Sequence, residues 1–484
     1  MDILMAQELF PDQVSTDRFA QNLLYIVGAA AALVFMAGLM LVDVGTVRRR
    51  NVLDVASQRI VGFFIGAVGY YIVGHAIWNW QYYEAFGAEN PLSDSISDWW
   101  FGGSLTNALA QEVDPAVSDI NNAQIFLPFL ALYAGLTCVL VHFALVERVK
   151  ASAFYVISAV VGTILFPLMV YLTWGSTSPL TNSGVHDFFG VFAVYIFGGT
   201  MALVFARRVG PRVGIFKPDK RLGGDGYAKP YNLGLTAVGV MLILIGVPLV
   251  VVACGFFFPG SGYFGIAMST TSIGLVFENL FAAMSAGSIV GAFIAYRTRK
   301  IVFLLLGPLA GYIAAATGFD VLQPWEAFLI GMGGSIVAFL IYLFIVERWE
   351  TDEHKVIPLG FGVGIYGALI VGLVAWGTPT GGFFGIEEGT YAFQNAEVNL
   401  LWQLIGVAVT VAIAFVSSWI LILVLERTTG LRVSEEEEIA GLDVRYWDVT
   451  HDVPDTEAMG VVAGPDGDGS DGEAAYAARR EEVS

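Results

Sequence analysis

Apolar runs of about 20 residues recur along the whole chain, and they constrain its fold more than any other feature. An α-helix rises about 1.5 Å per residue, so about 20 apolar residues are needed to cross a hydrocarbon core about 30 Å thick. Hydrophobic residues make up 56% of the chain and charged residues only 14%, which favours a membrane protein over a water-soluble domain. We predict an all-α polytopic membrane protein with eleven spans, at 19–45, 58–80, 123–146, 151–174, 186–207, 232–257, 270–296, 301–319, 325–346, 357–377 and 398–425.

The positions of lysine and arginine support this count independently. Basic residues follow every second predicted span, namely at Arg48, Arg49, Arg50, Arg148, Lys150, Arg207, Arg208, Arg212, Lys217, Lys220, Arg221, Lys229, Arg297, Arg299, Lys300, Arg348, Lys355, Arg427 and Arg432. The loops between the other spans contain neither lysine nor arginine, at 81–122, 175–185, 258–269, 320–324 and 378–397. Cytoplasmic loops carry the excess of basic residues, so we predict the N-terminus outside and the C-terminus inside.

The longest cytoplasmic loop, 207–232, divides the predicted spans after the fifth. Two halves of five helices each must then have opposite orientations, as in inverted repeats related by an axis in the membrane plane, with an eleventh helix added. Small residues spaced four apart, at Gly287/Gly291 and Gly307/Gly311, predict close contacts between neighbouring helices.

The formal net charge of −19 is concentrated outside the predicted spans. We predict an extracellular N-terminal segment at 1–18, a membrane domain at 19–426 and an acidic cytoplasmic tail at 427–484. Most of the tail beyond 444 is rich in Asp, Glu and Gly and is expected to be disordered. Exposed acid of this density also favours a salt-tolerant organism, in which like charges are screened.

Four stretches at the ends of spans carry recognisable motifs. They read V-R-R-R-N-V-L at 47–53, E-R-V-K at 147–150, K-P-Y-N-L at 229–233 and G-L-R-V-S-E-E-E-E-I-A-G-L-D-V at 430–444. In the same order, they are similar to V-R-x-K-N-V-L, A-E-R-x-x, P-H-N-L and G-L-R-V-x-x-E-x-E-x-x-G-L-D of the ammonium transporter (Amt/Mep/Rh) family. The chain therefore resembles a divergent member of that family over about residues 19–445.

The stretch that begins at Asp187, D-F-F-G-V-F-A-V-Y, resembles the family's fifth helix, D-F-A-G-G-x-x-V-H, which carries a pore histidine. That position is Tyr195 here, the paired histidine of span ten falls on Gly360, and the family's second gating Phe falls on Val250. Imidazole suits proton relay because its pKa is near neutral, whereas Tyr titrates near a pKa of about 10. The resemblance implies a pore lined by Tyr195, Val250 and Gly360 that lacks the paired-histidine chemistry. Alternatively, the Tyr195 hydroxyl bonds a neighbouring helix.

The family recruits ammonium in an outer vestibule, where aromatic faces attract a cation. By the resemblance, Tyr133, Trp174 and Asp187 are the candidates for this role. The alternative for the two rings is anchoring at the membrane interface. The alternative for Asp187 is a carboxylate that caps a helix N-terminus.

Few other residues suggest chemistry. Glu278 in the seventh span either lines a polar path or packs as a neutral, hydrogen-bonded acid against another span. His75 and His142 are expected to be hydrogen-bonded core histidines. Cys138 and Cys254 both lie in apolar spans, so they indicate no disulfide framework. No cofactor or metal is predicted.

The resemblance implies transport of ammonium or ammonia through a pore in each protomer of a homotrimer, in the plasma membrane, and no enzymatic reaction. Two alternatives stay open: a non-conducting ammonium sensor or assembly subunit that signals through its tail, and a channel for another small neutral solute. In the family the tail couples the subunits to trimeric PII-type nitrogen regulators. This implies a regulatory role for Gly430, Arg432, Glu435, Glu438 and Asp443.

Overall fold

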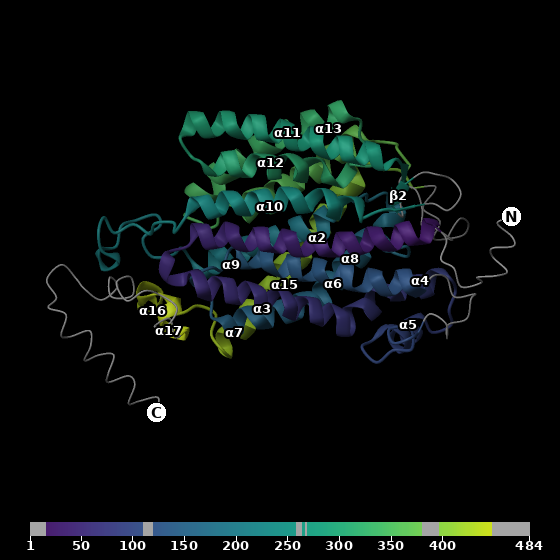
Figure 1. The fold of residues 1–484 in the computed structure, drawn as a ribbon, viewed down its shortest axis with the longest axis horizontal. Helices are drawn as coiled ribbons and strands as arrows, with labels where there is room; N and C mark the ends of the chain where they lie inside the picture. Colours follow the sequence, from purple (N-terminus) through teal and green to yellow (C-terminus); the bar gives the residue numbers. More distant parts are fainter. Residues whose placement is uncertain (1–15, 110–119, 258–263, 267–268, 380–395, 448–484) are drawn as a thin grey trace.

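The computed structural model describes residues 16–109, 120–257, 264–266, 269–379 and 396–447. Most of the predicted extracellular segment and the tail from 448 onward therefore lie outside the described residues. The described chain is almost entirely helical, so the predicted fold class is confirmed (Figure 1). Within it, ten helical segments are long and apolar enough to cross a membrane, and Val302–Gly318 is a shorter apolar helix at the position of the eighth predicted span. The full count of eleven spans and the orientation remain predictions.

Each predicted half forms a run of helices, several of which contain a wider π-helical turn labelled η. The first half comprises α2 (Thr16–Thr46), α3 (Val52–Gly69), η2 (Tyr70–Gly74), α4 (His75–Ala85), α5 (Pro91–Trp99), α6 (Ile120–His142), α7 (Ala151–Val160), η4 (Val161–Leu165), α8 (Phe166–Trp174), η6 (Val191–Ile196) and α9 (Phe197–Val209). The second half comprises α10 (Leu233–Val252), α11 (Ile273–Thr298), α12 (Val302–Ala315), α13 (Pro324–Ile341), η9 (Tyr342–Glu347), η10 (Ile357–Val363) and α14 (Gly364–Val374).

Shorter elements complete the chain. Between α10 and α11, three short antiparallel strands pair in the order β1 (Phe256–Phe257), β2 (Phe264–Ile266) and β3 (Ser269–Thr271). The last span, α15 (Leu400–Arg427), leads into α16 (Glu435–Ala440) and α17 (Leu442–Tyr446). Short 3₁₀ turns lie at η1 (Arg49–Asn51), η5 (Thr181–Ser183), η7 (Lys220–Leu222) and η8 (Ala316–Gly318).

The first helices of the two predicted halves, α2 and α10, lie side by side through the middle of the molecule (Figure 1). Their backbones touch at Gly38 and Gly239, where a Cβ on either residue would lie 2.6 Å from the carbonyl oxygen of the other. Towards the end of α2, Gly45 approaches Thr236, near the start of α10. The two helices are therefore antiparallel, as inverted halves require.

Glycines also join α11 to α12. A Cβ on Gly287 would lie 2.6 Å from Gly311 Cα, and one on Gly291 would lie 2.6 Å from Gly307 Cα. The predicted close packing of these two glycine pairs is confirmed. In a bilayer such contacts hold helices together because small residues let backbones approach closely.

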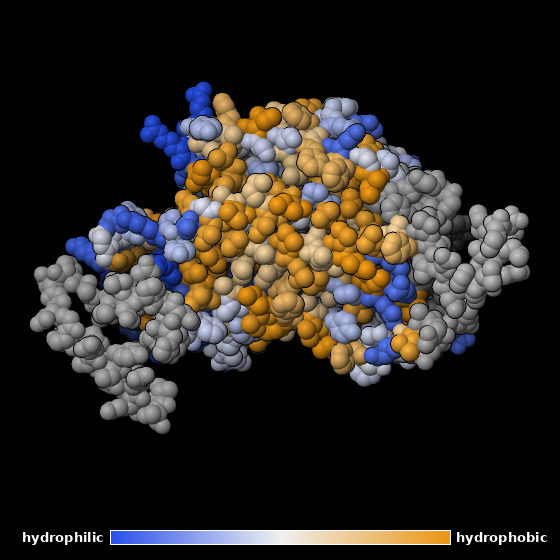
Figure 2. Space-filling view, viewed as in Figure 1, coloured by the Kyte–Doolittle hydropathy of each residue, from blue (hydrophilic) through white to orange (hydrophobic). Residues whose placement is uncertain are grey.

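Apolar and polar side chains are segregated along the helix direction. Figure 2 shows a broad hydrophobic surface over the middle of the helices, with hydrophilic residues gathered towards both ends. Long apolar side chains such as Ile245, Ile289 and Phe293 are more than half exposed there. A surface of this kind matches the hydrocarbon core of a bilayer between two polar interfaces.

Candidate functional site

Three aromatic side chains form a cage at the predicted outer end of the pore. The rings of Tyr133 in α6 and Trp174 in α8 have centroids 6.4 Å apart, and Phe189, in the loop before η6, lies 6.3 Å from Tyr133. Tyr133 is buried and Trp174 half-buried. The Tyr133 hydroxyl oxygen lies 3.2 Å from Cys254 Sγ. Phe189 could not be singled out from the sequence, since it is one of many apolar residues in its stretch.

Asp187 fixes both the start of η6 and the Trp174 ring of this cage through hydrogen bonds. Its Oδ1 accepts hydrogen bonds from the backbone N–H groups of Gly190 (3.1 Å) and Val191 (2.8 Å), and its Oδ2 accepts one from Phe192 (3.0 Å). The helix therefore begins at Val191 and not at residue 186, because the buried carboxylate caps its first turn. The Asp187 carbonyl accepts a hydrogen bond from Trp174 Nε1 at 2.6 Å, which fixes the indole.

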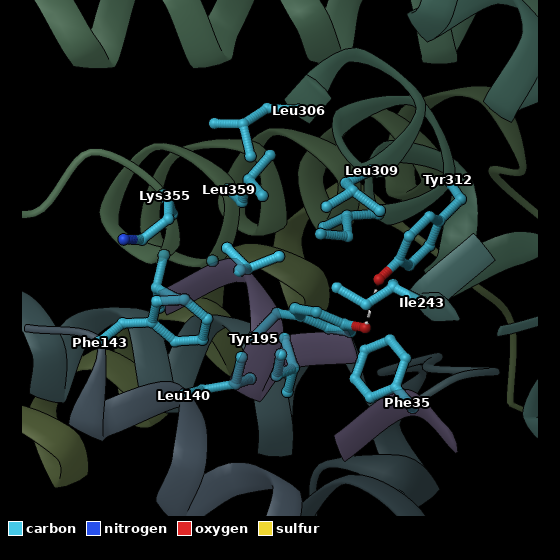
Figure 3. A pocket seen from close by; sticks show the side chains of 15 residues that line it. Phe35, Leu140, Phe143, Tyr195, Ile243, Leu306, Leu309, Tyr312, Lys355 and Leu359 are labelled. Atoms are coloured by element: carbon cyan, nitrogen blue, oxygen red, sulfur yellow. Dashed lines mark hydrogen bonds between the residues drawn. The ribbon is translucent and has the colours of Figure 1, made fainter. Parts of the chain in front are cut away.

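Beyond the cage, two tyrosines meet hydroxyl to hydroxyl. The oxygen atoms of Tyr195, from η6, and Tyr312, from α12, lie 2.8 Å apart (Figure 3). The Phe189 ring lies 6.4 Å from that of Tyr195 and 6.3 Å from that of Tyr312, so the aromatic series is continuous from the cage inward. A hydroxyl donates one hydrogen bond and accepts two. The pair therefore keeps a donor and several lone pairs for a third small polar molecule.

Two small cavities lie on either side of Tyr195, which lines both. The outer one measures about 10 Å³ and is bounded by Tyr133, Phe189 and Val250 among others. The inner one measures about 40 Å³, and apart from the tyrosine pair and Lys355 at its far end it is lined by apolar residues (Figure 3). One water molecule needs a cavity of about 10–15 Å³. The inner cavity therefore has room for a few water-sized molecules.

Gly360 borders the inner cavity, but its lack of a side chain leaves no gap. A Cβ at this position would lie 2.5 Å from the Tyr195 carbonyl oxygen and 3.1 Å from Gly199 Cα. The backbones of η10 and η6 have closed together there, and both are wide π-helical turns, which occur often at functional sites. The polar partner of Tyr195 is instead Tyr312, which lies in a different helix and is part of no motif identified in the sequence.

Glu278 occupies neither of the positions considered for it. It is exposed on the outside of α11, away from both cavities, so both predicted alternatives are wrong. The buried polar side chain is its neighbour Asn279, whose Nδ2 donates to the carbonyls of Phe319 and Leu322, each at 2.7 Å. One residue corresponds to about 100° around a helix, so the adjacent side chain faces the core instead.

The two core histidines have ordinary partners. His75 Nδ1 lies 3.3 Å from the Tyr70 hydroxyl, and His142 Nε2 lies 3.1 Å from Gln58 Oε1. Neither histidine lines either cavity.

A buried ion network joins three loops on the predicted cytoplasmic face. Arg212 binds Asp352 through both oxygens, at 2.7 and 2.9 Å, and Glu147 Oε2 at 2.6 Å. Arg148 lies 3.3 Å from Asp352 on its other side. Burial alone would raise the pKa of the Asp352 carboxyl, but Arg212 and Arg148 outweigh burial and hold that pKa well below its usual value. Burial would likewise raise the pKa of Glu147, and Arg212 and Arg48 together lower it.

The tail segment packs on this network through buried carboxylates. Glu438 accepts hydrogen bonds from Arg432 Nη2 and from the backbone N–H of Val213, each at 2.7 Å. Asp443 accepts from the backbone N–H groups of Leu53 (3.0 Å) and Asp54 (2.7 Å) at the start of α3. These two residues of the family-like tail stretch therefore hold it against the membrane domain.

Gly430 and Glu435, two further tail candidates, have different surroundings. Gly430 adopts a φ of +78°, which favours glycine, and its N–H bonds the Leu425 carbonyl at 2.8 Å to end α15. Glu435 is exposed and lies 3.2 Å from Arg221. Its position in the first turn of α16 leaves it accessible to solvent.

Residues 24–451 match the model of a family described as the Ammonium Transporter Family. Among curated proteins, the chain is 25% identical over 438 residues to an ammonium transporter, Amt1, of Methanocaldococcus jannaschii, covering 89% of this chain and 96% of that protein. It is 26% identical over 472 residues to an ammonium transporter, Amt1, of Haloferax mediterranei, covering 90% and 80% of the two chains.

Solved structures give the same fold. A protein described as a sensor Amt protein superposes with a TM-score of 0.70 at 22% identity, over 89% of this chain and 98% of that one. Mep2 of Candida albicans superposes with a TM-score of 0.64 at 17% identity, over 86% and 87%.

Proposed function

Since the chain belongs to the Ammonium Transporter Family, we propose that it carries ammonium nitrogen across a membrane, with uncharged ammonia crossing the pore of each protomer. One observation carries this proposal. An aromatic cage, an outer cavity, a hydroxyl pair and an inner cavity follow one another through shared residues, Tyr133, Phe189 and Tyr195. This order provides a place to hold a cation, then a narrow apolar path for a neutral molecule.

Recruitment is assigned to the cage. A desolvating ammonium ion is stabilised by the negative face of an aromatic ring, by about 0.5–2 kcal/mol. Tyr133 and Trp174 supply two such faces, and Asp187 fixes the Trp174 indole through its carbonyl. In this proposal Asp187 acts by positioning the ring, because its carboxylate is already bonded to three backbone N–H groups.

Passage is assigned to the tyrosine pair. An ion entering either apolar cavity would lose its hydration without compensation, so ammonium passes its proton to water on the outer side and ammonia alone enters. Ammonia both accepts and donates hydrogen bonds, and the Tyr195 and Tyr312 hydroxyls match it at the narrow point between the cavities. Val250 and Gly360 border this path, and both keep it narrow and apolar.

The same proposal includes the assembly and its surroundings. We assign the protein to the plasma membrane as a multi-pass homotrimer. We assign the cytoplasmic face, where Glu438 and Asp443 dock the tail and Glu435 stays exposed, to contact with a PII-type nitrogen regulator. The buried docking contacts and the exposed first turn of α16 support that assignment.

The test is ammonia flux into vesicles. Purified protein in liposomes, loaded with a pH-sensitive dye, should accelerate internal alkalinisation after an ammonium pulse relative to empty vesicles. Val250→Trp fills the outer cavity and should reduce that flux at least about 10-fold, since the path is closed sterically. Val238→Trp is the matched control, because Val238 is 50% exposed on the outside of the same helix and should leave flux unchanged.

A non-conducting sensor is the second candidate, favoured by the similarity to a sensor Amt protein and by the altered pore. That reading predicts no flux above empty vesicles, together with ammonium binding measured by calorimetry and lost in Trp174→Ala. A channel for another neutral solute predicts no ammonia flux but faster osmotic swelling with a small uncharged solute such as glycerol.

A further inference from the structure

The short helix α5 lies beside α4, near one end of the helix bundle (Figure 1). It belongs to the predicted extracellular loop after the second span, and none of its residues lines either cavity. Two contacts hold it on α4. Ser95 Oγ donates to the Ala76 carbonyl at 2.6 Å, and the ring of the buried Trp99 lies 5.1 Å from that of His75. α5 is therefore fixed to the flank of α4.

The apolar side of α5 is wider than the surface that α4 covers. Four large apolar residues of α5 and of the two positions after it are between 46% and 56% exposed, and we call them the α5 patch: Leu92, Ile96, Trp100 and Phe101. Asp94 and Asp98 lie on the opposite side of the helix from Leu92 and Ile96, because each follows one of them by two residues and successive residues are about 100° apart. α5 is thus amphipathic even after its contact with α4 is formed.

The level of this patch in the membrane follows from the helix beside it. α3, η2 and α4 belong to one continuous helix, and α3 begins at Val52, directly after the basic residues that mark the predicted cytoplasmic side. Ile72 follows 20 residues later, which corresponds to about 30 Å of helix, the thickness of the hydrocarbon core. The Ile72 carbonyl accepts a hydrogen bond from the Phe101 backbone N–H at 3.3 Å. The α5 patch therefore lies at the predicted outer edge of the hydrocarbon core, where tryptophan is enriched.

The α5 patch also continues the apolar outer surface of α3. Phe64, Val68 and Ile72 are exposed and are spaced four residues apart, so they form one row along the outside of the helix. This row leads to the level at which α5 is attached. There the Phe101 ring lies 5.9 Å from the ring of Tyr71, the neighbour of Ile72. The surface that faces the acyl chains therefore extends onto α5.

We propose that α5 is an interfacial anchor, which lies in the outer headgroup layer of the bilayer with the α5 patch towards the acyl chains. Burial of apolar surface in the boundary between headgroups and acyl chains stabilises this position. Residues 81–109 contain four acidic residues and neither lysine nor arginine, so apolar contact and not charge binds the lipid. The same acids disfavour a second copy of α5 as the partner, because like charges would meet. This inference concerns attachment to the membrane and is independent of what the pore conducts.

Spin labels on the two sides of α5 test the anchor in a bilayer. Ile96→Cys places a nitroxide on the α5 patch, and Ser97→Cys is the matched control, because Ser97 is exposed on the polar side of the same turn. Both are made in Cys254→Ser protein, and the buried Cys138 is retained, with the protein lacking the new cysteine as the blank. In phosphatidylcholine vesicles, relaxation of each label by oxygen, which concentrates among acyl chains, is compared with relaxation by a water-soluble nickel chelate. The oxygen-to-nickel ratio should be at least about three-fold higher at Ile96 than at Ser97, since an interfacial helix buries its apolar side by about 5–10 Å.

Three other results would overturn the proposal. Equal ratios at the two positions, with the nickel chelate reaching both labels, would place α5 in water. An Ile96 label that neither reagent reaches would show that protein covers the patch, as a second copy of the chain would. A ratio that reverses in vesicles containing anionic phosphatidylglycerol would contradict binding through apolar contact. Leu92→Cys, on the same patch, replaces Ile96→Cys if the latter is not monodisperse after purification.

Discussion

At the predicted cytoplasmic face, Arg212, Glu147 and Asp352 satisfy one another through ion pairs of fixed geometry. Along the proposed pore, by contrast, Tyr195 and Tyr312 share a single hydrogen bond between two apolar cavities. The ion network lies next to stretches that match the family motifs. Several of the residues that line the two cavities, in contrast, differ from the residues that the family has at those positions. Buried charges tolerate few replacements, because each needs its own partner at the right distance. A narrow apolar path with one polar point can be built from several helices, so its residues can change position.

The largest expected effect is the loss of stability when the buried ion network is disrupted. Arg212→Ala leaves two buried carboxylates short of a partner, and we expect it to lower the free energy of unfolding by about 3 kcal/mol. Thermal unfolding of detergent-solubilised protein measures the change. Arg221→Ala is the control in the same loop, because its side chain is 53% exposed and ion pairs at an exposed position contribute little to stability. Equal losses in both variants would contradict a special role for the buried network.

The network should also make stability depend on pH. The pKa of Asp352 is lower in the folded protein than in the unfolded chain, so the ionised carboxylate stabilises the fold above the unfolded pKa of about 4. This contribution is lost as the pH falls through the folded value. Between about pH 5 and 3, we expect the melting temperature of the wild type to fall more steeply than that of Asp352→Asn, which has no carboxyl group to titrate. Parallel curves would show that other groups govern acid stability.

A smaller effect tests how tightly the pore helices have closed. Gly360→Ala places a Cβ 2.5 Å from the Tyr195 carbonyl oxygen, so η10 must move away from η6, at a cost of about 1–3 kcal/mol. Gly274→Ala is the matched control, because a Cβ there meets only Ser272 Oγ at 3.7 Å and alanine favours the helix. Melting temperatures of both variants give the comparison. A Gly360→Ala protein as stable as the wild type would mean that the two segments separate at little cost.

The smallest effect concerns the pore hydroxyls. Tyr312→Phe keeps the ring and removes the hydrogen bond to Tyr195, worth about 1 kcal/mol, so we expect about five-fold lower ammonia flux. Tyr195→Phe should cost a similar factor, and the double variant little more than either, since both remove one shared bond. Tyr366→Phe is a control tyrosine that borders neither cavity. Unchanged flux in all three pore variants would place passage elsewhere.

Much of the fold could be predicted because it depends on properties that a sequence states directly. Apolar length gives the spans, and the glycine pairs at Gly287 and Gly307 give a helix contact that the structure confirms. The packing of the tail through Glu438 also fits the motif that suggested it. The sequence is less informative about which side of a helix a given residue faces. Glu278 is exposed and Asn279 is buried, and a one-residue difference in helix phase separates the two.

The pore was harder to predict for a related reason. Tyr312 lies in an apolar span, where a tyrosine facing lipid and one facing a cavity look alike in sequence. In the sequence, Lys355 is one of the basic residues that mark the predicted cytoplasmic side, and nothing there indicates a place in the cavity wall. Phe189 was one aromatic residue among many. Each depends on which helices meet, and one sequence does not contain that information.

The glycine contact between α2 and α10 has a consequence for synthesis of the chain. Gly38 meets Gly239 some 200 residues later, so the close-packing face of the first helix has no partner while the first half is being made. Until the ribosome has completed α10, that face is covered by lipid or by the insertion machinery. The middle of the protein is therefore assembled late, although it begins with the first helix to enter the membrane.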